Sequence, residues 1–285
     1  MIKMIAVDID GTLLDSRGQL PPAHRDALAE ASARGIAIVL ATGRAFHFAR
    51  PVAETLGLPL TLIVNNGAVV KDLDGTARLR RLLPSDIARQ VLAGTPGHES
   101  SVAVVFDRQP GDVRPEIVFE QMDWSHPHRK GYYRRNEAFI GEVPRLVDEM
   151  SEDPIQVMFN GGVAPMRALA ETLRGLPISA HMSVALTEYE LRDFSLLDVN
   201  AAGCTKGSTL AEWALGQGLT RDEVMAVGDN LNDLEMLEFA GTGVVMGNAS
   251  PAIKARGFEL TESHDENGLA LAIQRFVLRS RELQS

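Results

Sequence analysis

Cysteine is nearly absent from this sequence, which has only Cys204 among its 285 residues. One cysteine cannot form an intramolecular disulfide, so a disulfide framework is excluded and a reducing cytoplasm is favoured. Long apolar runs are also absent, because no stretch approaches the ~20 uncharged residues of a membrane helix. The N-terminal MIKMIAVDIDG runs directly into a predicted strand, without the apolar segment and cleavage site of a signal peptide. We therefore expect a cytoplasmic protein.

Positive charge is scarce as well. The 28 lysines and arginines are outnumbered by 38 aspartates and glutamates, which gives a formal net charge of −10. Nucleic acids and anionic membranes bind basic surfaces, so neither is expected as a partner. An anionic substrate would need a local concentration of positive charge or a bound cation.

Several common ligand-binding motifs are missing. TKGS (205–208) lacks the spacing of the phosphate-binding motif G-x-x-x-x-G-K-[ST], and neither G-x-S-x-G nor G-x-G-x-x-G occurs. No cluster of histidine and cysteine suggests zinc. A P-loop nucleotide site, a nucleophile-elbow hydrolase and a dinucleotide fold are therefore not indicated.

What is present at both ends of the chain is an alternation of apolar runs with helical patterns, which predicts a parallel α/β sheet. The expected strands are 4–8, 36–42, 60–66, 223–229 and 242–247. The expected helices are 21–35, 45–57, 206–217 and 231–239, followed by a short helix after Pro251 and a final one near 266–280.

The middle of the chain has a different pattern, with strands expected at 101–107, 116–121 and 154–160 and helices at 85–94 and 163–174. We interpret residues 83–197 as an α+β module inserted into a discontinuous core of residues 1–82 and 198–285. No internal repeat or low-complexity tract interrupts this plan.

Polar clusters follow the core strands at the point where each strand ends: DIDGT (8–12), ATGR (41–44), NNGA (65–68), GDNLND (228–233) and MGNA (246–249). Each cluster alone is ordinary turn chemistry. In an open parallel sheet, however, ligands bind at the carboxyl ends of the strands. The recurrence therefore predicts one polar pocket.

Carboxylates dominate this predicted pocket. If the first strand continues through Asp10, then Asp8 and Asp10 lie on the same face and each raises the pKa of the other. GDNLND adds Asp229 and Asp233. Such a cluster is destabilising without a cation, and Mg²⁺ prefers oxygen ligands of this kind. Asp233 has an alternative role as the cap of the helix that follows.

Cationic and donor groups accompany the carboxylates. Arg44 lies at the mouth of the second strand, and Lys206 lies immediately before a predicted helix start. A lysine there can neutralise both a phosphoryl oxygen and neighbouring carboxylates. Thr12 and Thr42 offer hydroxyl and backbone N–H donors.

DIDGT, the threonine of ATGR, Lys206 and GDNLND occur in the order that is typical of haloacid dehalogenase-like (HAD) phosphatases, and the chain resembles this superfamily. NNGA, MGNA, TESHDENG (261–268) and the position of the insert are similar to its Cof-like subgroup. The resemblance implies an α/β Rossmannoid core with an inserted α+β cap. It also implies a Mg²⁺-dependent phosphatase that acts on a small phosphorylated metabolite, such as a sugar phosphate.

The resemblance further implies roles for the motif residues. Asp8 would attack phosphorus and form an aspartyl-phosphate, while Asp10 would first protonate the leaving alcohol and then activate water. Mg²⁺ would be held by Asp8, by the backbone carbonyl of Asp10 and by Asp229, with Asp233 orienting Lys206 or water. The residues expected to hold the phosphoryl group are Thr12, Thr42, Gly43, Lys206 and Asn232.

Two other functions fit the same site. A phosphomutase or phosphotransferase would return the phosphoryl group to an organic acceptor. A phospho-accepting signalling protein also combines acidic residues, threonine and lysine, but the second aspartate of D-x-D and the large insert argue against it. The chain could be a monomer or a homodimer.

The insert contains one basic and aromatic stretch, HPHRKGYYRRN (126–136). One interpretation is a cap loop whose Arg129, Lys130, Arg134 and Arg135 attract an anionic substrate. The alternative is a solvated surface loop or a dimer contact, with Tyr132 and Tyr133 packed in the cap core.

Overall fold

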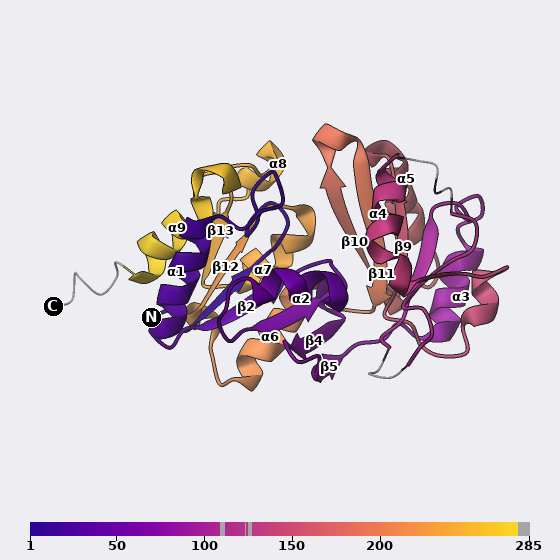
Figure 1. Cartoon of the computed structure of the whole chain (residues 1–285). Coiled ribbons are helices and arrows are strands. Elements are labelled where there is room, and N and C mark those ends of the chain that lie inside the picture. The colour runs from indigo at the N-terminus through magenta and orange to yellow at the C-terminus, as the bar shows by residue number, and fades with distance from the viewer. Residues whose placement is uncertain (109–111, 123, 125–126, 279–285) are drawn as a thin grey trace. The chain divides into compact units, whose positions relative to one another are not determined.

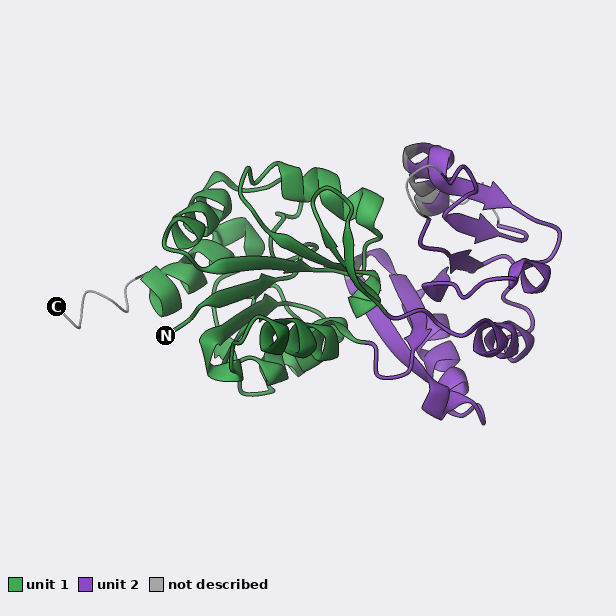
Figure 2. Cartoon of the chain, turned by 90° about the horizontal axis from the view of Figure 1, so that it is seen from below, with its two compact units in different colours: residues 1–80, 205–285 green, residues 81–204 purple. Residues whose placement is uncertain are grey.

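The computed structural model describes residues 1–108, 112–122, 124 and 127–278. The chain divides into two compact units, residues 1–80 with 205–285 and residues 81–204 (Figure 2). None of the helices in the described residues has the length and apolar character needed to cross a bilayer.

The first unit is built on an eight-stranded sheet in the order β14-β13-β12-β1-β2-β3-β4-β5. Among these strands, Figure 1 labels β13, β12, β2, β4 and β5. Its central strand β1 (Met4–Val7) pairs in parallel with β12 (Val224–Gly228) on one side and β2 (Ala37–Ala41) on the other. β3 (Thr61–Val64), β13 (Thr242–Val245) and β14 (Glu259–Leu260) extend the parallel part. Every residue of β1 and β12 is buried, as expected for parallel strands that are covered on both faces.

Helices cover this sheet where the sequence predicts them: α1 (Pro22–Ala33), α2 (Phe46–Glu54), α6 (Lys206–Gly216), α7 (Leu234–Phe239), α8 (Pro251–Lys254) and α9 (Gly268–Ile273). Proline at the first position suits the start of α1 and of α8 because its missing N–H has no helical partner there. The predicted final helix is interrupted, since α9 ends at Ile273 and continues as a wider π turn (Gln274–Leu278).

The far edge of the first sheet is antiparallel, which the sequence pattern does not predict. β4 (Val69–Asp72) and β5 (Ala77–Arg80) form a hairpin, and β4 runs antiparallel to β3. The hairpin follows directly from the tight NNGA turn at the end of β3, which reverses the chain without a crossover helix.

The second unit contains a six-stranded, mainly antiparallel sheet in the order β10-β11-β9-β6-β7-β8. The strands are β6 (Val102–Val105), β7 (Ile117–Phe119), β8 (Ile140–Glu142), β9 (Gln156–Gly161), β10 (Met182–Tyr189) and β11 (Phe194–Ala201). One face packs in a core with α3 (Ser85–Ala93) and α5 (Val163–Arg174). The expected boundary after residue 197 falls inside β11, so the unit extends to Cys204.

The basic stretch of the second unit is a helix, α4 (Pro127–Asn136), and not the predicted loop. Arg129 is partly buried and its Nε donates to Asn160 Oδ1 at 2.9 Å, whereas Lys130 and Arg134 are exposed. The rings of Tyr133 and Trp124 pack with their centroids 4.8 Å apart. These contacts stabilise a helix that has no apolar stripe of its own. The side chains of Tyr132 and Arg135 lie outside the described residues.

The buried His24 in α1 makes one contribution to the pH dependence of the free energy of unfolding. Its Nδ1–H donates to the carbonyl of Leu13 at 2.9 Å, while Nε2 is buried without a partner among the described residues. Burial lowers the pKa of this imidazole below 6.5, so the unfolded chain binds a proton more readily than the folded one. We expect the contribution of His24 to the free energy of unfolding to fall as the pH drops from about 7.5 to 5, by at most ~1.4 kcal/mol per pH unit for one proton.

Urea unfolding across this pH range tests the assignment. His24→Asn keeps an N–H donor near the position of Nδ1 but does not titrate, so the difference in stability between the variant and the unchanged protein should change with pH by the contribution of His24. An equal pH dependence in both proteins would exclude His24 as the source.

Candidate active site

The site lies where the direction of strand addition reverses. β2 and β12 flank β1 on opposite sides, and the loops after these three strands carry Thr42, Asp229 and Asp8. In an open α/β sheet this reversal leaves a crevice at the carboxyl ends of the strands. The predicted convergence of the strand-end motifs is therefore found around β1.

Lys206 joins two of the aspartates. Its Nζ donates to Asp8 Oδ1 and to Asp233 Oδ1, each at 2.7 Å, and the side chain is only 1% exposed. Lys206 begins α6, whose N-terminus is fixed by a capping box between Thr205 and Ser208. Burial would lower the pKa of Lys206, but the carboxylates of Asp233 and Asp8 outweigh it and raise the pKa. The lysine is therefore a fixed positive charge.

The Asp233 carboxylate forms hydrogen bonds with three neighbouring groups. While Oδ1 accepts from Lys206, Oδ2 accepts from the backbone N–H groups of Asp229 at 3.0 Å and Asn230 at 2.9 Å. Asn230 and Asp233 thereby form the capping box of the turn that leads into α7. Asp233 therefore stabilises the turn Leu231–Asp233, whereas its side chain makes no capping hydrogen bond to α7 itself. Both of its oxygens have hydrogen-bond donors.

Asp229 is held in the same crevice by the DIDGT loop. Thr12 Oγ1 donates to Asp229 Oδ1 at 3.1 Å. Gly11 has φ +91°, and a Cβ added to it would lie 2.2 Å from Asp229 Oδ2. Only glycine fits this close approach. The Thr12 hydroxyl, expected to face a phosphate, contacts Asp229 instead.

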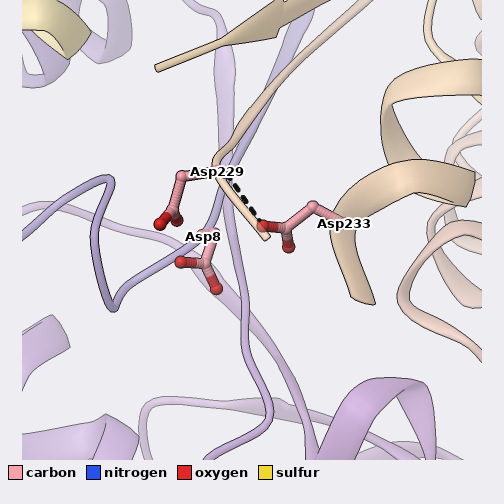
Figure 3. A group of neighbouring side chains, drawn as sticks. All are labelled: Asp8, Asp229 and Asp233. Carbon is pink, nitrogen blue, oxygen red and sulfur yellow. Dashed lines mark hydrogen bonds between the residues drawn. The ribbon is translucent and has the colours of Figure 1, made fainter. Parts of the chain in front are cut away.

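The three aspartates form a group that suits a hard cation (Figure 3). One carboxylate oxygen from each of Asp8, Asp229 and Asp233 lies within 4.8 Å of the others. Burial raises the pKa of Asp8 to about 7, despite Lys206, and raises the pKa of Asp229 well above its usual value. Lys206 alone thus leaves negative charge uncompensated, and a cation with oxygen ligands fits the donor set. Asp233 already accepts three hydrogen bonds, one of them from the Lys206 ammonium, so Asp8 and Asp229 are the side chains better placed to hold the cation.

Asp10 lies outside this group. β1 ends at Val7, so the alternation of a strand does not extend to Asp8 and Asp10, and the expectation that they lie side by side on one strand face is wrong. The Asp10 carboxylate forms a bidentate pair with Arg44, from Nε to Oδ2 at 2.7 Å and from Nη2 to Oδ1 at 2.6 Å. Each of these two aspartates therefore has its own cationic partner.

The NNGA turn connects the other loops of the site. Asn65, Asn66 and Gly67 all have positive φ, and asparagine and glycine adopt this conformation most readily. The N–H of Asn66 donates to Thr42 O at 3.0 Å, and Asn66 Oδ1 accepts from Asn232 Nδ2 at 2.9 Å. The turn thus ties the ATGR loop to GDNLND and fixes the Asn232 amide.

The similarity of this chain to known proteins shows its family. The sequence model of the haloacid dehalogenase-like hydrolases matches residues 5–273. The chain belongs to this family. It is 34% identical to the HMP-PP phosphatase of Serratia proteamaculans strain 568 over 255 residues, covering 90% of this chain and 87% of the relative. It is 30% identical to the pyridoxal phosphate phosphatase YbhA of Escherichia coli strain K12 over 267 residues, covering 89% and 91%.

Solved structures agree with the family assignment. A haloacid dehalogenase-like hydrolase from Bacillus subtilis superposes with a TM-score of 0.81 at 23% identity, covering 97% of this chain and all of the other. At this identity the likeness supports the fold. The predicted α/β core with a parallel sheet is thereby confirmed.

The remaining predicted residues of this HAD-family site also line the crevice loops. Thr42 is buried, and its hydroxyl accepts from Arg44 N at 3.1 Å while keeping its own proton to donate. Gly43 packs beside the Asn66 amide. Both therefore stay candidates for phosphate binding.

Sequence reasoning missed three groups of contacts: the Arg44 pair with Asp10, the bridging role of Asn66, and the contacts of Asn248 and His264 with the DIDGT loop. The motifs that carry the last two, NNGA, MGNA and TESHDENG, are visible in the sequence as polar clusters. Nothing in these clusters specifies which loop each side chain contacts.

Proposed function

We propose that this HAD-family chain is a cytoplasmic, Mg²⁺-dependent phosphatase that hydrolyses a small phosphorylated metabolite through an aspartyl-phosphate. The observation that carries the proposal is the buried Asp8–Lys206 pair beside Asp229 at the switch point of the sheet. The two relatives named above are phosphatases, one of them of pyridoxal phosphate. We expect a monomer or a homodimer.

In the first step Asp8 attacks phosphorus, and the bond to the leaving oxygen breaks as the aspartyl-phosphate forms. Lys206 holds Asp8 Oδ1, which leaves Oδ2 for the attack. The approach of two anions is costly without positive charge, so Lys206 acts both on the nucleophile and on the phosphoryl oxygens. Thr42, Gly43 and the neighbouring backbone donors complete the phosphoryl site.

Asp10 transfers the protons in this scheme. It gives a proton to the leaving alcohol in the first step and takes one from water when the phospho-enzyme is hydrolysed. Arg44 holds both oxygens of Asp10, so the carboxyl must turn away from Arg44 to reach the reacting oxygen. Between turnovers, Arg44 thus holds the Asp10 carboxylate in a defined orientation.

The acidic residues of the site form a set of oxygen ligands that suits Mg²⁺. Asp8, Asp229 and the backbone carbonyl of Asp10 would hold it, while Asp233 orients Lys206. When bound, the cation offsets the charge of the carboxylates and of the phosphate.

A phosphate-release screen tests the function. The protein should release phosphate from at least one member of a panel of sugar, nucleotide and cofactor phosphates with Mg²⁺, and lose this activity in EDTA. Isomerised product without free phosphate would indicate a mutase. A stable phospho-enzyme without turnover would indicate a signalling protein, and silence across the panel with Mg²⁺ would contradict the phosphatase.

The second unit contains a small cavity of about 50 Å³. Its wall combines aromatic and thioether groups with one guanidinium and one amide: Phe119, Trp124, Phe194, Met158, Arg129 and Asn160. Pockets of this composition bind the organic part of a ligand and orient it with a few polar groups. We propose that this cavity helps to select the substrate.

Arg129→Ala is therefore expected to raise KM for the best substrate about tenfold, the loss of one charged hydrogen bond, with little change in kcat. Lys130→Ala is the matched control, because Lys130 is exposed on the same helix and does not line the cavity. Steady-state kinetics of both variants decide the point. Equal KM values in the two variants would remove Arg129 from substrate binding.

A further inference from the structure

Two side chains from the C-terminal part of the chain meet at one backbone oxygen of the DIDGT loop. The carbonyl of Gly11 accepts from Asn248 Nδ2 at 2.9 Å and from His264 Nδ1 at 3.1 Å. These residues belong to MGNA and TESHDENG, which have no role in the mechanism proposed above. We call Asn248 and His264 the Gly11 clamp.

The two halves of the clamp also hold each other. Asn248 Oδ1 accepts from the backbone N–H of His264 at 3.0 Å, which fixes the amide with its nitrogen toward Gly11. The next residue, Asp265, accepts from the backbone N–H of Ser16 at 2.9 Å. The segment that begins with the DIDGT loop is thus held at two points along its length.

The clamp reaches the candidate metal ligand as well. Asn248 Nδ2 lies 3.3 Å from Asp229 Oδ2, while Thr12 donates to Asp229 Oδ1. Gly11 closes the third side, because no Cβ could fit between it and this carboxylate. The rotation of the Asp229 carboxylate is thereby set by three neighbours. Groups that orient metal ligands in this way affect metal affinity without touching the metal.

We propose that Asn248 is a positioning residue for Mg²⁺ binding, which acts by fixing the Asp229 carboxylate and, through Gly11, the adjoining Asp10 carbonyl. This inference rests on the proposed Mg²⁺ site. The side chain of His264 contributes through Gly11 alone, so the effect of replacing it is smaller. Asn248 is exposed, so its loss leaves no buried cavity and the variant should fold.

Calorimetric titration of the substrate-free protein with Mg²⁺ measures the effect directly. Asn248→Ala should bind Mg²⁺ roughly tenfold more weakly, the lower end of what such neighbours contribute. The rise in Tm on adding Mg²⁺ should shrink accordingly. At saturating Mg²⁺, kcat and the KM for substrate should return close to their original values, which a general structural defect would not permit.

Four further variants sharpen the test. Ser263→Ala is the matched control, because this side chain lies in the same loop and donates to Glu266, away from Gly11 and Asp229. It should bind Mg²⁺ normally. His264→Asn keeps an N–H near the position of Nδ1 and should rescue most of the loss seen in His264→Ala. Asn248→Ser repeats the deletion of the amide if the alanine variant does not fold.

The possible failures are distinguishable. If Asp229→Asn binds Mg²⁺ as tightly as the unchanged protein, the proposed metal site itself is wrong. If Asp229 is required but folded Asn248→Ala binds Mg²⁺ with unchanged affinity, the proposed site stands and the positioning role is overturned. Loss of kcat that saturating Mg²⁺ does not restore would also overturn it.

Discussion

Asp8→Asn is expected to lower phosphate release by at least about 10⁴-fold, because an amide cannot form the phospho-enzyme and the loss of a nucleophile is of this order or larger. The fold should survive. Asparagine keeps an oxygen for Lys206 Nζ, and burial already raises the pKa of Asp8 to about 7, so a neutral side chain is tolerated there. Phosphate release at saturating Mg²⁺ and urea unfolding measure the two effects.

The Asp10→Asn variant distinguishes the role of Asp10 from that of Asp8. It should also lose turnover on ordinary substrates, but its nucleophile is intact and its missing role is proton transfer. With p-nitrophenyl phosphate, whose leaving group needs little protonation, it should still form a phospho-enzyme and release about one nitrophenolate per protein. Asp8→Asn should show no such burst.

A matched control for both substitutions is Asp26→Asn in α1. Asp26 is exposed and pairs with Arg25 on the surface, so this variant should keep full activity. If Asp8→Asn retained most of its activity with Mg²⁺ present, the assignment of the nucleophile would be wrong.

The sequence predicts the general location of this site because two physical rules act together. Apolar runs that are buried on both faces identify parallel strands, and parallel strands bring their carboxyl ends to one edge. Asp8, Asp229 and Lys206 meet there although Asp8 and Lys206 are 198 positions apart. The acidic cluster and its lysine therefore follow from the residues and their spacing alone.

The arrangement within the site depends on details that the pattern does not carry. Whether Asp8 and Asp10 lie side by side depends on where β1 ends, and the structure ends it at Val7. The turn through Gly11 then directs Asp10 toward Arg44. Beyond the end of the strand its regular alternation no longer applies, and the turn sets the direction of each side chain.

The errors outside the site have a similar cause. The stretch 126–136 has no periodic apolar face, so its helix depends on contacts made by Trp124 and Asn160, residues of other segments. The antiparallel pairing of β4 with β3 depends on the left-handed NNGA turn that joins these two strands. Tertiary contacts override the local pattern in the first case, and the conformation of the turn decides the second.

Lys206→Met is expected to have the second large effect, on stability as well as on activity. Lys206 is the cation that lies between Asp8 and Asp233, and all three side chains are buried. Removal of one partner from such a pair leaves buried carboxylates uncompensated and costs about 3–5 kcal/mol of unfolding free energy. Phosphate release should fall to background, because the nucleophile and the phosphoryl oxygens lose the same cation.

The loss should depend on pH in a defined direction. Without Lys206 the carboxyls of Asp8 and Asp229 lose an interaction that lowers their pKa, so their pKa values rise further above those of the unfolded chain. The folded variant then binds more protons than its unfolded state, and its stability should increase as pH falls toward the pKa of the unfolded carboxyls. Urea unfolding in EDTA at several pH values tests this trend.

The double variant Lys206→Met with Asp233→Asn distinguishes charge from packing. Asp233 loses its charge but keeps an oxygen for its capping contact, so part of the lost stability should return while activity stays absent. If the double variant were less stable than the single one, the damage would lie in the packing around α6 and not in uncompensated charge. Recovery in the double variant would instead show that Lys206 is retained to make a buried acidic site compatible with a folded protein.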